Sequence, residues 1–101
     1  MAYAVRFSDA AAADYDKLPL PLQNFVDGYI HQVAVDPVGL GGPSRFPFPP
    51  GCKTFHFDHP DFDGERHDFT LLFRFQPTLG EVQIVGIGHQ VRHPAPPSGQ
   101  P

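Results

Sequence analysis

Proline and glycine are concentrated in two segments, and these segments limit what the chain can fold into. The chain has 13 prolines and 10 glycines among its 101 residues. The stretch 37–51 consists mostly of these two residues, which excludes a helix and a central strand because proline lacks the amide hydrogen. Residues 94–101 have no large apolar side chain to bury, so we expect a disordered tail there. The sequence therefore predicts a single domain over residues 1–93, with a connector at 37–51 between its two halves.

The composition indicates a folded protein and argues against membrane and secreted classes. Apolar residues make up 41% of the chain and include ten phenylalanines, which is enough for a packed core. No apolar run approaches the roughly 18 residues that cross a bilayer, and the N-terminus lacks the pattern of a secretory signal. A single cysteine, Cys52, excludes an internal disulfide and a thiolate metal cluster. These features predict a cytoplasmic protein that does not enter a membrane.

The first half of the chain predicts a strand and two helices. Residues 3–8 alternate between large apolar and smaller or polar side chains, as a half-buried strand does. Ser8 stands where an N-cap belongs, before an alanine-rich helix that runs to about Leu18. A second helix begins near Pro21 and stops before Pro37. Its apolar residues recur at steps of three and four: Leu22, Phe25, Val26, Tyr29, Ile30 and Val33. The short link between the helices predicts an antiparallel helical hairpin.

The second half predicts three strands. Apolar and polar residues alternate over 53–58 and again over 69–76, with an acidic loop between them. After a turn at 77–80, the run 82–89 is apolar at both parities, as in a central strand. The predicted fold is α+β in the order β-α-α-β-β-β, an antiparallel sheet with the helical hairpin packed on one face.

Strand alternation then predicts what the uncovered face of the sheet carries. If the odd-numbered aromatic residues of the first three strands face the helices, then Arg6, His56 and Arg74 face the other way. In the last strand Gln83 and His89 share one parity, so we expect His89 on the same uncovered face. The net charge of −4 counts against a dedicated nucleic-acid binder. The acidic residues are concentrated before residue 37 and in 58–68, however, which leaves the sheet side mildly basic.

Four segments carry a resemblance to a known family. They are Tyr3-Ala4-Val5-Arg6-Phe7-Ser8, the helix end Asp36-Pro37, Asp68-Phe69-Thr70-Leu71-Leu72-Phe73-Arg74-Phe75, and Ile84-Val85-Gly86-Ile87-Gly88-His89. In this order and spacing the chain resembles the RelE/ParE toxin superfamily of bacterial type II toxin–antitoxin systems, over residues 3 to about 93. The resemblance implies a cytoplasmic toxin with an antitoxin partner. Some members cut messenger RNA in the ribosomal decoding site, and others inhibit DNA gyrase without being nucleases.

The nuclease activity implies a set of site residues. Cleaving RNA through its own 2′-hydroxyl needs a base, an acid and a cation near the phosphate, and histidine and arginine can fill these roles. His89 matches a histidine that several members have at the end of the last strand, so the resemblance implies that His89 is the catalytic acid or base. Arg74 and Arg92 are the catalytic candidates that would bind the phosphate. The candidates for binding ribosome-bound RNA are Arg6, Lys53, His56, Arg66 and His93. No cofactor and no metal are expected for this activity.

Departures from the family pattern leave alternatives open. The family often has a tyrosine-arginine pair where this chain has Phe69-Thr70, and an arginine where it has Gln90. These losses favour a non-catalytic protein-binding module of the same fold, either an inactive toxin homologue or a gyrase-inhibitor-like one. Without an RNA target, His89 would bond a backbone carbonyl and Arg74 would pair with Glu81.

The histidines support a third hypothesis. The segment 56–68 contains three histidines and several carboxylates, which suggests a divalent-metal domain. It requires His56 and His59 to converge with His67 or His89. A hairpin loop with turn-forming Asp, Pro and Gly residues explains the same composition without a metal.

Overall fold

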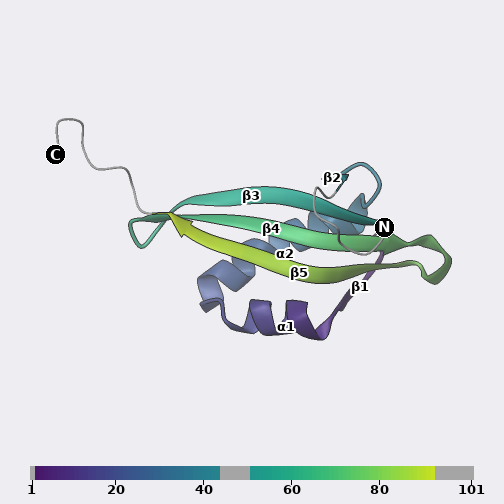
Figure 1. Cartoon of the computed structure of the whole chain (residues 1–101), viewed down its shortest axis with the longest axis horizontal. Coiled ribbons are helices and arrows are strands. Elements are labelled where there is room, and N and C mark those ends of the chain that lie inside the picture. Colours follow the sequence, from purple (N-terminus) through teal and green to yellow (C-terminus); the bar gives the residue numbers. More distant parts are fainter. Residues whose placement is uncertain (1, 44–50, 93–101) are drawn as a thin grey trace.

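The computed structural model describes residues 2–43 and 51–92, and its elements follow the predicted order (Figure 1). They are β1 (Ala4–Phe7), α1 (Asp9–Asp16), α2 (Leu20–Val35), β2 (Gly42–Pro43), β3 (Cys52–Phe62), β4 (Glu65–Gln76), a 3-10 turn (Pro77–Leu79) and β5 (Glu81–Arg92). The strands form one sheet in the order β1-β5-β4-β3-β2. The three long strands are antiparallel, and β1 lies parallel to β5 at the edge. The predicted α+β fold is confirmed, and the sheet is mixed because the first strand joins it in parallel.

The proline-rich segments lie partly outside the described residues. Of the predicted connector, Gly42–Pro43 forms the short edge strand β2, which pairs with β3. This position agrees with the exclusion of a central strand, because an edge strand tolerates proline. The other part of the connector, 44–50, the predicted tail at 94–101 and the candidate residue His93 lie outside the described residues.

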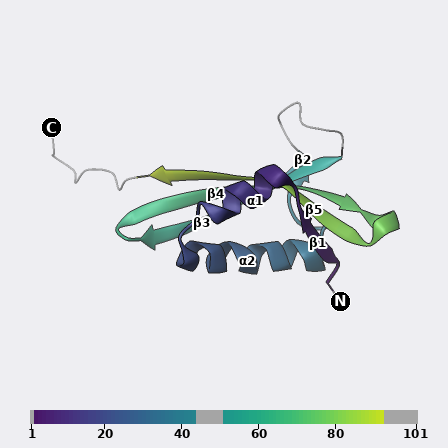
Figure 2. The same ribbon diagram turned by 90° about the horizontal axis from the view of Figure 1, so that it is seen from below.

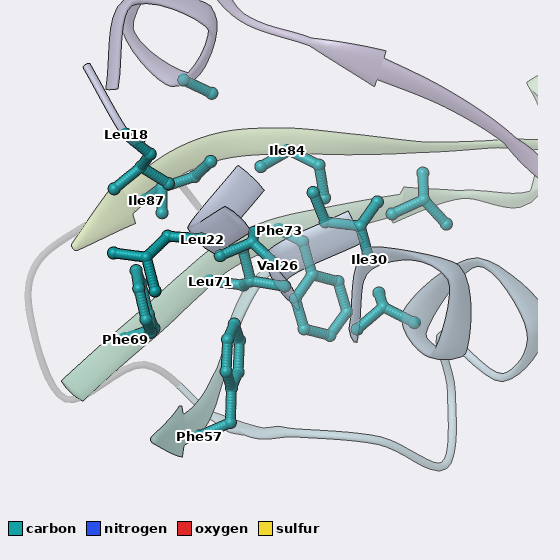
Figure 3. Close-up of a cluster of buried hydrophobic side chains, with 13 residues drawn as sticks. Leu18, Leu22, Val26, Ile30, Phe57, Phe69, Leu71, Phe73, Ile84 and Ile87 are labelled. Carbon is teal, nitrogen blue, oxygen red and sulfur yellow. The ribbon is translucent and has the colours of Figure 1, made fainter. Parts of the chain in front are cut away.

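The helices form a hairpin on one face of the sheet. Figure 2 shows α2 running along this face, with α1 beside β5. Two side-chain bonds join the helices: the Tyr15 hydroxyl donates to Asp27, and the Gln23 amide donates to the Tyr15 carbonyl. The apolar stripe of α2 packs against the odd-numbered residues of β3 and β4, as predicted (Figure 3). The most buried large side chains of this core are Phe69, Phe73, Leu22, Leu71, Ile84 and Val26.

The predicted acidic loop is mostly strand, so its prediction was wrong. β3 continues to Phe62 and β4 begins at Glu65, which leaves only Asp63 and Gly64 between them. Both residues have positive φ, 59° and 79°, as a type I′ hairpin turn requires. Asp61 supports the turn by accepting a hydrogen bond from the Gly64 amide. The polar residues of this segment therefore stand on paired strands, which fixes their relative positions.

A β-bulge in β5 changes which residues face the helices. Leu72 pairs with Gly86 and Phe73 pairs with Ile84, so Val85 is an extra residue without a partner on β4. Before the bulge, Ile84 faces the core and Gln83 faces the uncovered side. After it, odd-numbered residues face the helix side. The bulge therefore separates Gln83 from His89, which the sequence places on one face.

Ser8 joins the start of α1 to this bulge. Its hydroxyl oxygen accepts a hydrogen bond from the Ala11 amide and donates one to the Val85 carbonyl. We expect Ser8→Ala to lower the free energy of unfolding by about 1–2 kcal/mol, because it removes a helix cap and leaves a bulge carbonyl unsatisfied. Urea denaturation measures this loss. Ser8→Thr, which keeps the hydroxyl, is expected to retain most of the stability, and an equal loss in both variants would contradict the account.

Candidate functional site

An open cleft lies on the face of the sheet that the helices leave uncovered. It has a volume of about 320 Å³, and Phe57 and Phe69 are among the residues that line it. Thr70 lies between buried Phe69 and Leu71, so its side chain points away from the core and into this cleft. Gly88, opposite Thr70 on β5, has no side chain that would fill the middle of the cleft. The other lining residues are His56 and Asp58 from β3, Arg66 and Asp68 from β4, and Gln90 and Arg92 from β5. We call this site the open-face cleft.

Charged residues of both signs surround one end of the cleft. The strand register sets Asp58 opposite Asp68 and Arg66 opposite Arg92, so the attractive contacts run along β4 or diagonally between strands. Arg66 Nε lies 3.2 Å from Asp68 Oδ1 and 3.5 Å from Asp58 Oδ2, and Arg92 Nε contacts Asp68 Oδ2. The two arginines and two aspartates carry no net charge together. Both arginines can nevertheless reach an anion, because more than half of each side chain is exposed.

His56 is the histidine of the cleft. Its Nδ1 lies 2.8 Å from the Thr70 hydroxyl oxygen, directly across the strand pair. This bond holds the imidazole ring over the cleft and leaves Nε2 available. An imidazole that shares a cleft with two arginines can move a proton at a phosphate that the arginines bind.

Arg6 and Arg74 also lie on the uncovered face, as predicted, but outside the cleft. Both are level with Gln83, whose side-chain oxygen accepts a hydrogen bond from Arg74 at 3.0 Å. Arg74 is four residues along β4 from Thr70, in the direction away from Arg66, and is not among the residues that line the cleft. Glu81 lies 3.6 Å from Arg6 rather than beside Arg74, so the predicted alternative pairing of Arg74 with Glu81 was wrong.

Lys53 is on the helix side of the sheet. Its ammonium group donates to the carbonyls of Pro37 and Val38, just beyond the C-terminus of α2, and lies 5.8 Å from the centre of the Phe73 ring. Lys53 therefore faces away from the cleft and holds the end of α2 against the sheet. Strand parity explains the position, since Lys53 pairs with buried Phe73.

Solved structures give the comparison that identifies the fold. The chain is similar to the toxin–antitoxin complex RelBE2 of Mycobacterium tuberculosis, with a TM-score of 0.68 and 24% identity over 89% of this chain and 93% of that chain. The chain has the RelE fold. An arginine-to-alanine double mutant of the Escherichia coli toxin RelE in the free state gives a TM-score of 0.63 and 16% identity over 87% of this chain and 83% of that chain.

A second Escherichia coli structure, the intact RelBE toxin–antitoxin complex, gives a TM-score of 0.63 and 18% identity over 86% of this chain and 95% of that chain. No family model matches the chain, and no curated protein matches its sequence. The likeness is therefore one of fold rather than of closely related sequence.

The RelE fold brings the two departures of this sequence into one place. Thr70 and Gln90, the two positions at which the sequence departs from the pattern it resembles, both line the open-face cleft. Asp58 and Asp68 complete it, and sequence reasoning missed them as site residues. Asp58 and Asp68 have the same even parity as His56 and Thr70, which would have placed them on the same face. The segment was expected to be a loop, so strand alternation was not applied to it.

His89 lies on the other face of this RelE-fold sheet, so the prediction that it shares a surface with Arg74 was wrong. It pairs with buried Phe69 and stacks on that ring, with centroids 4.7 Å apart. Its Nε2 lies 2.8 Å from Nδ1 of His67, which is 5% exposed. The bulge at Val85 is the cause, because it reverses the parity of the residues that follow.

The histidine pair predicts a pH dependence of stability. Burial lowers the pKa of His89, and the charge of neighbouring His67 lowers it further. The unfolded chain takes up this proton near pH 6.5, so acidification through that pH favours unfolding. We expect the Tm to fall from pH 7 to pH 5, and the fall to be smaller in His89→Gln. The control His31→Gln, on the exposed side of α2, is expected to keep the full fall. An identical fall in the wild type and His89→Gln would contradict this assignment.

The described part of the chain does not contain the ligand set that the metal hypothesis requires. Within 2–43 and 51–92, no group of three or more His, Cys, Asp or Glu side chains is placed to hold a metal ion. His56 and His59 stand at opposite parities of β3, so their side chains point to opposite faces. The same ranges contain no helix long and apolar enough to span a membrane.

Proposed function

We propose that this chain is the toxin of a bacterial type II toxin–antitoxin system, and that it inhibits translation by cutting messenger RNA at the ribosome. The observation that carries the proposal is the RelE fold, which extends over 89% of this chain and 93% of the Mycobacterium tuberculosis chain. Two of the similar structures are complexes of a toxin with its antitoxin. This supports a small antitoxin protein as the partner of this chain.

The chemistry of the proposed activity fits the open-face cleft. In cleavage by the RNA's own 2′-hydroxyl, the 2′ oxygen attacks phosphorus and the bond from phosphorus to the 5′ oxygen breaks. One proton leaves the 2′-hydroxyl and another reaches the 5′ oxygen, while negative charge grows on the phosphate. We assign both transfers to His56, which accepts the proton of the 2′-hydroxyl and donates a proton to the 5′ oxygen, because this histidine shares the cleft with two arginines. Arg92 keeps its predicted role as a phosphate ligand, and Arg66 acts with it.

The other predicted site residues in the described part of the chain lie outside the cleft. Arg6 and Arg74, on the same face, are assigned to the RNA backbone outside the cleft. His89 has no role in this scheme, because its ring faces the helix side. Lys53 is assigned to stability, since its ammonium group is bound to the end of α2.

Regulated expression in a bacterial host tests this function. We expect the wild-type protein to arrest growth and its cells to contain messenger RNA cut within coding sequence. Co-expression of a small antitoxin, if an adjacent open reading frame encodes one, is expected to restore growth. Continued growth with well-expressed, folded wild-type protein would refute the toxin function.

A non-catalytic protein-binding module of the same fold is the second candidate, and two observations favour it. Both arginines of the cleft are paired with aspartates, and Thr70 and Gln90 replace the arginines common in the family. In the expression experiment, this candidate predicts either growth arrest with intact transcripts, as for a gyrase inhibitor, or no arrest at all, as for an inactive homologue. The state of the transcripts therefore separates a nuclease from a growth inhibitor of another kind.

A further inference from the structure

Asp68 is the residue that joins the two arginines of the open-face cleft. Its Oδ1 lies 3.2 Å from Nε of Arg66, and its Oδ2 contacts Nε of Arg92. The Asp68 side chain is 26% exposed, compared with 56% for Arg66 and 60% for Arg92. The carboxylate is thus the more fixed partner, and it occupies one donor of each guanidinium.

Asp58 has a weaker hold on one of these arginines, Arg66. It lies within ion-pair distance of Arg66, at 3.5 Å, and its side chain is 43% exposed. The two carboxylates stand opposite each other on β3 and β4, so each adds negative potential where a bound phosphate would lie. A phosphate entering the cleft therefore competes with Asp68 for both guanidinium groups and with Asp58 for one.

We infer that Asp68 sets the affinity of the cleft for RNA, by holding Arg66 and Arg92 in internal ion pairs that an incoming phosphate must displace. The inference rests on the proposed function and adds to it a residue that controls RNA affinity. The free protein binds single-stranded RNA weakly, because its phosphate ligands are already neutralised. Removing the charge of this one carboxylate releases both arginines and strengthens binding.

The geometry predicts an order among isosteric variants. Asp68→Asn keeps the side-chain shape and removes the charge that contacts both arginines, so we expect about a tenfold rise in RNA affinity. Asp58→Asn removes a charge that reaches one arginine at longer distance, and the expected rise is about two- to threefold. Asp16→Asn makes the same change in net charge on the exposed end of α1, on the helix side, and is expected to leave the affinity within twofold.

Fluorescence anisotropy with a labelled, uncleavable 2′-O-methyl RNA hexamer measures these affinities. Thermal unfolding of each variant confirms that it is folded. We also expect a steeper dependence of log affinity on log salt for Asp68→Asn than for wild type, by about 0.7 for each further phosphate of the single strand that the freed arginines neutralise. An equal rise of RNA affinity in all three variants would show that net charge causes the effect, and it would overturn the inference. Unchanged or weaker binding by Asp68→Asn would overturn it too, since the carboxylate would then be positioning the arginines for RNA.

This assay separates the inference from the proposed function. Binding of the hexamer requires neither cleavage nor a ribosome. Growth arrest by the wild type, with no rise of affinity in Asp68→Asn, would leave the toxin function standing and remove the role of Asp68. The predicted order of affinities in a protein that does not arrest growth would keep the role of Asp68 and remove the toxin function.

Discussion

Phe73→Ala is expected to lower the free energy of unfolding by about 3–5 kcal/mol, the usual cost of removing a buried aromatic ring. Phe73 is fully buried in β4, the middle strand of the three long antiparallel strands (Figure 3). Its ring packs in the core with Val26 of α2 and Ile84 of β5 and supports the Lys53 ammonium group. Truncation therefore leaves a cavity between the sheet and α2. Urea denaturation followed by circular dichroism measures the loss.

Leu79→Ala provides the matched control for this loss. Leu79 is 65% exposed in the 3-10 turn before β5, so we expect a change within about 0.5 kcal/mol. Since whole domains are stable by about 5–15 kcal/mol, the Phe73 variant is expected to lose a large part of its stability. A loss below about 1 kcal/mol would contradict the position of Phe73 in the core.

His56→Ala is expected to lower the rate of messenger RNA cleavage by 10²- to 10⁴-fold, the usual contribution of a proton-transferring side chain. The His56 ring lies at the cleft, next to Thr70, and is exposed, so its removal is expected to leave the stability nearly unchanged. A purified translation system with a defined message measures the rate. His31→Ala, an exposed histidine on α2, is expected to retain full activity. A His56 variant that cuts at the wild-type rate would exclude His56 from proton transfer.

Strand and helix order could be predicted because the relevant side chains repeat with clear periods. Phenylalanine and leucine alternate with polar residues along β3 and β4, and the α2 stripe repeats at steps of three and four. The hairpin tip was missed for a physical reason. Asp63-Gly64 is a strong two-residue turn signal, but the acidic residues around it are common in loops as well as on exposed strand faces.

The candidate site was only partly predictable, because the register of the last strand was not. β5 is apolar at both parities, so periodicity alone does not say which residues face the helices. The adjacent apolar residues Ile84 and Val85, followed by Gly86, mark the bulge in retrospect. Arg6, His56 and Arg74 were placed on the correct face because β1, β4 and the first part of β3 alternate between the two faces without a bulge. His89 was misplaced because it follows the bulge.

Comparing His56→Ala with His89→Ala tests most directly the proposal that the open-face cleft cuts messenger RNA. The two histidines stand on opposite faces of the same sheet. The measurement is the mapping of 5′ ends of a defined message after translation in the presence of each variant. The account predicts cleavage at the same positions by the wild type and His89→Ala, and none above background by His56→Ala. Loss of cleavage in His89→Ala with cleavage retained in His56→Ala, or an intact message with the wild-type protein, would contradict it.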